Sequence, residues 1–221
     1  MKDSQFGLVQ GILLDLGWSS PQFEDRGRGF SFAKDETLDM HYSGAQSTSN
    51  EVTAAELIVS AEQSELERIF KNYGEENLYK EIAAAIVAAR TIKSIERTGE
   101  LVEIVLQTYR TKLKTNKEIP WVGGLHPATK VFQALRIAVN DELGVVERVI
   151  PQAMQVLAPG GRLAIIAFHS LEDRIVKHMF KDLEVKKIGA IITKKPIECS
   201  PEEAAANTRA RSAKLRLIQK N

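Results

Sequence analysis

Two uninterrupted apolar runs predict strands that are buried in a sheet. Gly11–Leu14 and Leu163–Phe168 contain no polar residue, as expected of strands that are covered on both faces. The first run stops at Asp15, and the Gly-, Ser- and Pro-rich stretch that follows predicts an irregular loop. Two shorter runs nearer the C-terminus are further strand candidates, Ile188–Ile192 and Leu215–Ile218.

Helical signals dominate residues 46–124. Thr53 and Glu56 have the spacing of a capping box, and Ser64 and Glu67 repeat that spacing further along the chain. Apolar residues then recur at helical spacing, and no strand pattern interrupts them. We therefore predict a helical subdomain in this part of the chain.

The segments on either side, residues 1–45 and 125–221, combine strands with helices. Pro127 is typical of a first helical turn, and Ser170 is positioned to cap a helix that begins at Leu171. Strands that alternate with helices are typical of an α/β fold. We predict one α/β domain built from these two segments, with the helical subdomain inserted between them.

The composition is that of a globular protein. The chain has 221 residues, of which 43% are hydrophobic and 27% charged. Its apolar runs fall far short of the roughly 18 residues that a membrane span needs, so we expect no membrane association. The single cysteine, Cys199, cannot form an internal disulfide and suits a reducing, cytoplasmic compartment.

Charge is distributed unevenly along the chain. Residues 1–60 hold nine acidic and four basic residues, whereas residues 186–221 hold nine basic and three acidic ones. A basic C-terminal segment indicates either a polyanionic partner such as RNA or a solvated basic edge. The candidate contacts to RNA phosphates are Lys194, Lys195, Arg209, Arg211, Lys214 and Arg216, unless Arg209 or Arg211 forms a structural ion pair.

Asp15 and the loop after it carry the candidate chemistry. Open α/β sheets bind ligands at the carboxyl ends of their strands, which is where Asp15 is predicted to lie. Its carboxylate can hold a cationic group such as a sulfonium, while Ser20 and the carbonyl next to Pro21 can accept hydrogen bonds from an exocyclic amine. Asp, Gly, Ser and Pro are also the usual residues of a turn that merely ends a strand. The residues alone leave both interpretations open.

Four blocks of sequence resemble the ribosomal RNA small-subunit cytosine-N4 methyltransferase family. They are DLGWSSPQ at 15–22 with RGFSF at 28–32 and LDM at 38–40, HPATKVFQALRIAVNDEL at 126–143, LAPGGRLAIIAFHSLEDRIVK at 157–177, and NTRARSAKLR at 207–216. The blocks follow the family's order and cover most of the chain, least so in the helical part. The resemblance implies the C-terminal part of a Rossmann-like, class I methyltransferase sheet, interrupted by a helical insert that recognises the substrate.

The resemblance also implies a reaction and a site. The reaction is methyl transfer from S-adenosylmethionine to the N4 amine of a cytidine in small-subunit ribosomal RNA, free or in the assembled subunit. By position, Asp15 and Gln22 would contact the cofactor, and Ser19, Ser20 and Pro21 would form the catalytic turn beside the target base. That triplet is also similar to the Ser-Pro-Pro turn of DNA amino-methyltransferases, so a DNA substrate is an alternative.

Phe30 and His169 are candidates for the pocket of the target base. Phe30 alternates with Phe32 and can stack on a flipped base, although such pairs more often pack in a core. His169 follows the second predicted strand and either lines the cleft or has a structural role. His169, Ser170 and Asp173 lie too close in sequence for a hydrolytic triad, and without a third ligand at suitable spacing we expect no metal.

The sequence departs from the family pattern in two places. The family begins with a Gly-rich strand–loop–helix and an acidic residue for the ribose, and neither occurs here, because Gly160-Gly161 precedes a strand. The sequence resembles roughly the last two-thirds of a complete enzyme. We expect this N-terminally truncated chain to bind S-adenosylmethionine weakly or not at all and to be inactive as given. The second departure is His41, where the family usually has arginine.

The missing segment leaves two further expectations. A chain without the cofactor loop can also be a non-enzymatic RNA-binding remnant, which is the main alternative to an enzyme. The strand at Gly11–Leu14 should present an unpaired edge, which favours self-association such as a homodimer.

Overall fold

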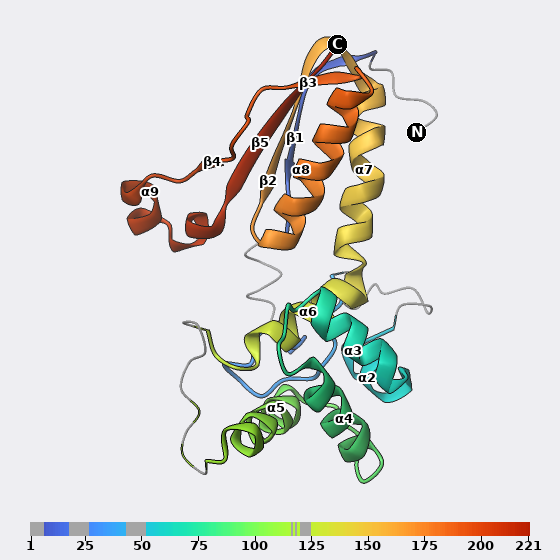
Figure 1. Ribbon diagram of the computed structural model, residues 1–221, viewed down its shortest axis with the longest axis vertical. Coiled ribbons are helices and arrows are strands. Elements are labelled where there is room, and N and C mark those ends of the chain that lie inside the picture. The colour runs from blue at the N-terminus through green and yellow to red at the C-terminus, as the bar shows by residue number, and fades with distance from the viewer. Residues whose placement is uncertain (1–6, 18–26, 43–51, 116, 118, 120–124) are drawn as a thin grey trace. The chain divides into compact units, whose positions relative to one another are not determined.

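A computed structural model describes residues 7–17, 27–42, 52–115, 117, 119 and 125–221, without the side chain of Arg209. The chain forms two compact units (Figure 1). Unit 1 comprises Met1–Gly17 and Glu142–Asn221, and unit 2 comprises Trp18–Asp141. Unit 2 extends beyond the expected 46–124 insert because residues before and after that insert share its hydrophobic core.

Unit 1 is a mixed sheet with helices, which confirms the α/β fold class. Its strands are β1 (Val9–Asp15), β2 (Leu157–Ala167), β3 (Gly189–Ile191), β4 (Ile197–Glu198) and β5 (Lys214–Lys220). The strand order is β1-β2-β5-β3, with β4 also paired to β5. β1 and β2 are parallel, and the other pairs are antiparallel. Its helices are α7 (Glu142–Val156), α8 (Ser170–Val185), α9 (Pro201–Ala206) and the 3-10 helix η2 (Thr208–Ser212).

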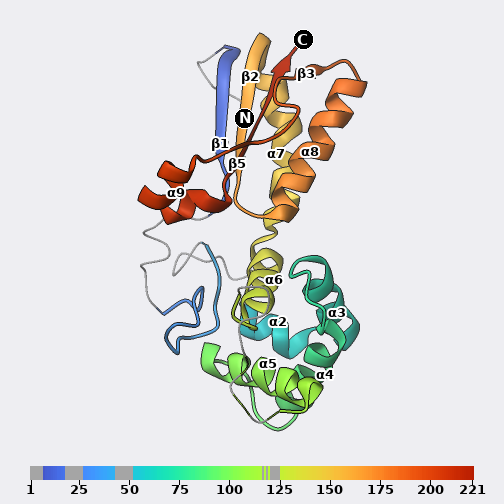
Figure 2. The same cartoon turned by 60° about the vertical axis from the view of Figure 1, so that its left-hand side comes forward.

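Helices α7 and α8 lie against one face of this sheet (Figures 1 and 2). Ile12, Leu163 and Ile218 are neighbours in the strand register and belong to the core beneath these helices. The next residue along β1, Leu13, points to the opposite face and is 63% exposed. The expectation that β1 is buried on both faces was therefore wrong. Among the described residues β1 pairs only with β2, and self-association through its other edge stays a prediction.

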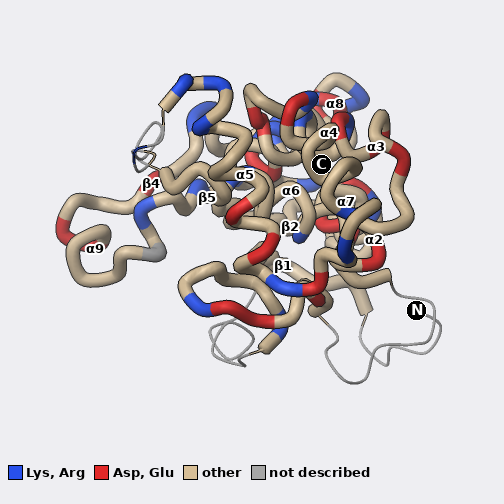
Figure 3. The backbone as a smooth tube through the Cα atoms, turned by 90° about the horizontal axis from the view of Figure 1, so that it is seen from below, with Lys and Arg blue, Asp and Glu red and all other residues tan. Residues whose placement is uncertain are grey.

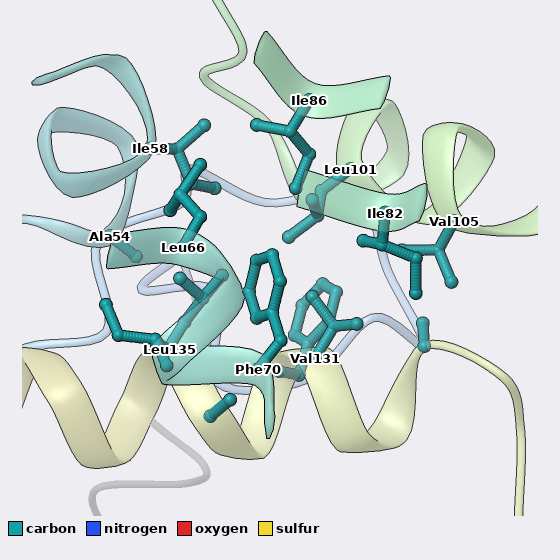
Figure 4. Packing of buried hydrophobic residues seen from close by; sticks show 14 of the residues in the cluster. Ala54, Ile58, Leu66, Phe70, Ile82, Ile86, Leu101, Val105, Val131 and Leu135 are labelled. Atoms are coloured by element: carbon teal, nitrogen blue, oxygen red, sulfur yellow. The ribbon is translucent and has the colours of Figure 1, made fainter. Parts of the chain in front are cut away.

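Unit 2 is a helical bundle around its own core. Its helices are α2 (Ala54–Ser60), α3 (Gln63–Asn72), α4 (Tyr79–Arg90), α5 (Thr98–Leu113) and α6 (Thr129–Asn140). Phe70 and Leu135 are among the fully buried side chains at its centre (Figure 4). Leu38 and Met40, from the segment before α2, belong to the same cluster. No helix in the described part of the chain is long and apolar enough to cross a membrane.

The two predicted capping boxes have different outcomes. The Thr53 side chain accepts the Glu56 N–H, and the Glu56 carboxylate accepts the Thr53 N–H, which confirms the first box. The second prediction was wrong, because α3 begins at Gln63 and Ser64 lies inside its first turn. The N-cap of α3 is Glu62, whose side chain makes no capping hydrogen bond.

Candidate functional site

The parallel strands β1 and β2 end at the same edge of the sheet, and Asp15 lies there. Asp15 pairs in register with Ile166, and the Leu16 N–H donates to the Ile166 carbonyl at 3.0 Å. Gly17 follows with φ = +90°, and a Cβ at that position would lie 3.6 Å from the Phe168 ring. The exposed carboxylate of Asp15 and the turn at Gly17 therefore both lie beside the end of β2. Ser19, Ser20, Pro21 and Gln22 lie outside the described residues, so their roles stay predictions.

His169 lies just after β2 and is the N-cap of α8. Its Nδ1 accepts the Glu172 N–H at 3.4 Å, and Glu172 Oε2 accepts the N–H groups of His169 and Phe168 at 3.3 and 2.8 Å. This reciprocal arrangement is a capping box in which histidine takes the place of serine or threonine. The prediction that Ser170 caps this helix was wrong, because Ser170 is already its first residue.

Glu172 is a buried carboxylate that holds the backbone at the end of β2. It is only 2% exposed, and burial raises the cost of its negative charge. The imidazole of His169 and the two backbone N–H groups outweigh this cost and hold the pKa of Glu172 below its ordinary value. An ionised carboxylate in the first turn also interacts favourably with the dipole of α8.

Glu142 is a residue of this edge that the sequence reasoning missed. Glu142, His169 and Glu172 each offer one ligand atom, and these atoms lie within 4.8 Å of one another. Helix packing brings together residues that are far apart in sequence, so no spacing motif could have revealed the group. Both carboxylates lie in first helical turns, where helix dipoles stabilise negative charge. The contacts that the structure describes for His169 and Glu172 are those of the cap of α8.

Phe30, in unit 2, packs within its own unit. Its ring stacks on Tyr42 with centroids 5.7 Å apart and planes 20° apart, and the Arg28 guanidinium lies 5.5 Å from its centroid. Phe32 packs edge-on against Phe132 at 4.9 Å, as expected of a core residue. A stacking role for Phe30 toward a base stays a prediction.

His41, where the family usually has arginine, is buried and paired with a neighbour. It is 4% exposed, and its Nδ1 lies 2.8 Å from Asp39 Oδ1. Arg28 donates to the His41 carbonyl at 3.1 Å, and the residue before His41, Met40, has φ = +65°. The side chain of His41 is therefore held inside unit 2.

The structure describes the side chains of all the candidate RNA contacts except Arg209, whose role stays a prediction. Lys194, Lys195 and Arg211 are exposed. Arg216, by contrast, is 7% exposed and binds Asp173 through two hydrogen bonds of 2.6 and 3.0 Å. Arg216 as a phosphate contact was therefore a wrong expectation, because its guanidinium is held between β5 and α8.

Comparisons with known proteins give a consistent result. A model described as the MraW methylase family matches residues 1–221. The chain is 46% identical to the "Ribosomal RNA small subunit methyltransferase H" of Heliobacterium modesticaldum, over 97% of this chain and 70% of that protein. Proteins of the same name from Elusimicrobium minutum and Paramagnetospirillum magneticum are 49% and 45% identical, over 97% and 94% of this chain and 68% and 66% of their own lengths. The chain thus spans about two thirds of the length of these relatives.

Proposed function

The chain belongs to the MraW methylase family, and we propose that it transfers a methyl group from S-adenosylmethionine to the N4 amine of a cytidine in small-subunit ribosomal RNA. The three relatives above carry names that specify methylation of small-subunit ribosomal RNA. The observation that carries the proposal is Asp15, an exposed carboxylate at the edge where two parallel strands end.

Asp15 and Gly17 are the described residues of the proposed cofactor site. Asp15 fits a cationic group, since its carboxylate is exposed and lies on the sheet face that α7 and α8 leave open. The glycine turn at Gly17 lets a ligand approach the backbone closely. Among the described residues no Gly-rich turn joins a strand to a helix in the way that cofactor-cradling loops do.

S-adenosylmethionine, when bound, would supply a methyl group on a positively charged sulfur for transfer to the N4 nitrogen of the cytidine. The amine would lose one proton to solvent water as its nitrogen is methylated. In the proposed site Asp15 holds the cationic side of the cofactor, while Ser20 and the carbonyl next to Pro21 accept hydrogen bonds from the amine. These bonds favour the pyramidal nitrogen that attacks, and in-line positioning of this kind can supply about 7–11 kcal/mol at best.

Two measurements test the proposal. Calorimetry with S-adenosylmethionine on the 221-residue chain should give weak binding or none, and micromolar affinity would overturn that expectation. Methyl transfer is then assayed on small subunits, with nucleoside mass spectrometry to identify N4-methylcytidine. The protein for this assay is the chain fused to the part of the Heliobacterium relative that it does not match.

Variants of the fusion protein separate catalysis from folding. Asp15→Ala should lower methyl transfer at least tenfold and leave the melting temperature unchanged. The matched control is Asp182→Ala, which removes an exposed carboxylate from α8 and should change neither. A fusion protein that folds but produces no N4-methylcytidine would contradict the proposed reaction and favour an RNA-binding remnant. Equal loss of activity and stability in Asp15→Ala would make Asp15 structural.

A further inference from the structure

The segment between β3 and β5, residues 192–213, projects from the sheet and is called here the C-terminal arm. In Figures 1 and 2, α9 lies beyond the strands on the side away from α7 and α8. α9 contains no buried residue, and Ala210 is the one buried residue among the arm side chains that the structure describes. Because the arm buries so little apolar surface, packing gives it little stability of its own.

The base of the arm is nevertheless fixed to β5. The Leu217 carbonyl accepts the N–H groups of Ile192 and Thr193 at 3.0 and 3.4 Å, and the Leu217 N–H donates to Thr193 Oγ1 at 2.9 Å. A few residues later β4 pairs with the start of β5. The turn that holds Lys194 and Lys195 is thus attached to the same strand at both of its ends.

Two acidic residues of the arm have described contacts. Glu198 lies 4.0 Å from Lys214, and Glu202 lies in the first turn of α9. Hydrogen bonds from its own backbone and from the Ser200 hydroxyl hold the pKa of Glu202 below its ordinary value. Figure 3 marks these acidic positions in red and the basic positions of the arm in blue.

Three basic residues of the arm form no ion pair with a described carboxylate. Lys194, Lys195 and Arg211 are exposed, and no ion pair joins any of them to a carboxylate in the described parts of the chain. Exposed cations on a projecting segment that pair with no described carboxylate can contact a chain of phosphates. Arg216, which belongs to the same basic segment of sequence, is excluded because Asp173 binds it.

We infer that the C-terminal arm clamps the phosphate backbone of the substrate RNA through Lys194, Lys195 and Arg211. The identity of the polyanion as RNA rests on the proposed function. Contacts to phosphates position a protein on its substrate and carry no sequence information. The arm therefore sets affinity and placement, whereas selection of the cytidine depends on other residues.

The salt dependence of RNA binding tests this inference on the 221-residue chain. The probe is a single-stranded oligocytidylate, whose dissociation constant is measured without cofactor at several salt concentrations. Each phosphate contact to single-stranded nucleic acid contributes about −0.7 to the slope of log K against log salt concentration. The triple variant Lys194→Ala, Lys195→Ala, Arg211→Ala should therefore reduce the magnitude of this slope by about 2. Its affinity at low salt should fall at least tenfold.

A matched control removes three exposed cations from elsewhere in unit 1. The triple variant Lys177→Ala, Lys181→Ala, Lys186→Ala changes α8 and its end, and it should leave the slope nearly unchanged. Hydrogen exchange gives a second measurement, in which RNA should slow the exchange of α9 amides in the unmodified chain.

Three results would overturn the inference: equal slope changes in the arm and control variants, no change in the arm variant, or no RNA binding by the unmodified chain at low salt. None of these measurements involves methyl transfer. RNA binding by the 221-residue chain that depends on the arm, together with a folded fusion protein that forms no N4-methylcytidine, would support the clamp and refute the proposed reaction. Methyl transfer by the fusion protein that is insensitive to the arm variant would refute the clamp and support the proposed reaction.

Discussion

The ion pair between Asp173 and Arg216 should be one of the larger single contributions to the stability of unit 1. The pair is bidentate, and the two side chains are only 13% and 8% exposed. Asp173→Asn removes the charge, keeps the size of the side chain and leaves the guanidinium buried without its counter-ion. Breaking a buried pair on one side costs about 3–5 kcal/mol. Because solvent reaches part of this pair, we expect Asp173→Asn to lower the free energy of unfolding by about 3 kcal/mol.

The effect of Asp173→Asn should also depend on pH. Burial opposes ionisation of Asp173, but hydrogen bonds and charge from Arg216 outweigh it, so the pKa of the folded state is lowered. A lowered folded pKa stabilises the protein above the unfolded value of about 3.9, and this stabilisation is lost as pH falls through the folded pKa. The difference in stability between the unmodified chain and Asp173→Asn should therefore be full at neutral pH and shrink below about pH 4.

Hydrogen exchange of α8 and β5 amides measures this difference within unit 1, and urea unfolding at neutral and acidic pH gives its pH dependence. The control is Glu198→Gln, which removes the carboxylate of the exposed pair with Lys214 and should cost less than about 1 kcal/mol. If the two variants lose similar stability at neutral pH, or if the loss in Asp173→Asn is the same at about pH 3, the argument from the buried pair is wrong.

Three further predictions concern the fold. Thr53→Ala removes the capping box of α2 and should cost about 1 kcal/mol in urea unfolding, whereas Ser60→Ala at the end of the same helix should cost less. Gly74→Ala places a Cβ 2.6 Å from a backbone carbonyl of α6 and should lower stability by about 1–3 kcal/mol, and an unchanged unfolding midpoint would contradict the packing. Leu13→Lys on the open face of β1 should reduce self-association in sedimentation measurements, whereas Val59→Lys on α2 should not; a concentrated solution of the unmodified chain that stays monomeric would refute this.

Local signals in the sequence predicted the elements well where the chemistry was local. The capping box at Thr53 depends on residues three apart, and it forms as expected. The strands near Gly11 and Leu163 were recognisable because a short apolar run next to turn-forming residues is typical of a strand. Caps such as His169 were not predictable, since an imidazole acts as an N-cap only when its ring is oriented by a partner such as Glu172.

The burial of β1 could not be inferred from its sequence. Ile12 and Leu13 are equally apolar, yet the first faces the core under α7 and α8 and the second is exposed. An apolar run indicates that both faces of a strand tolerate burial, but the helices that cover each face come from distant parts of the chain. The run at Gly11–Leu14 thus indicates a strand suited to a sheet covered on both sides, although only one side is covered among the described residues.

The same limit applies to the site. Asp15 could be placed at a strand end from sequence because the boundary between an apolar run and a polar loop is local. Arg216 could not be separated from Lys194 by charge alone, because its partner Asp173 lies on α8, which only the packing of the helix on the sheet brings close. The number of basic residues in a sequence therefore overestimates how many of them can contact RNA. The structure identifies which of them are paired with a carboxylate, as Arg216 is with Asp173. The salt dependence of RNA binding should accordingly respond to Arg211 and not to the internal Arg216, although the two lie only a few residues apart.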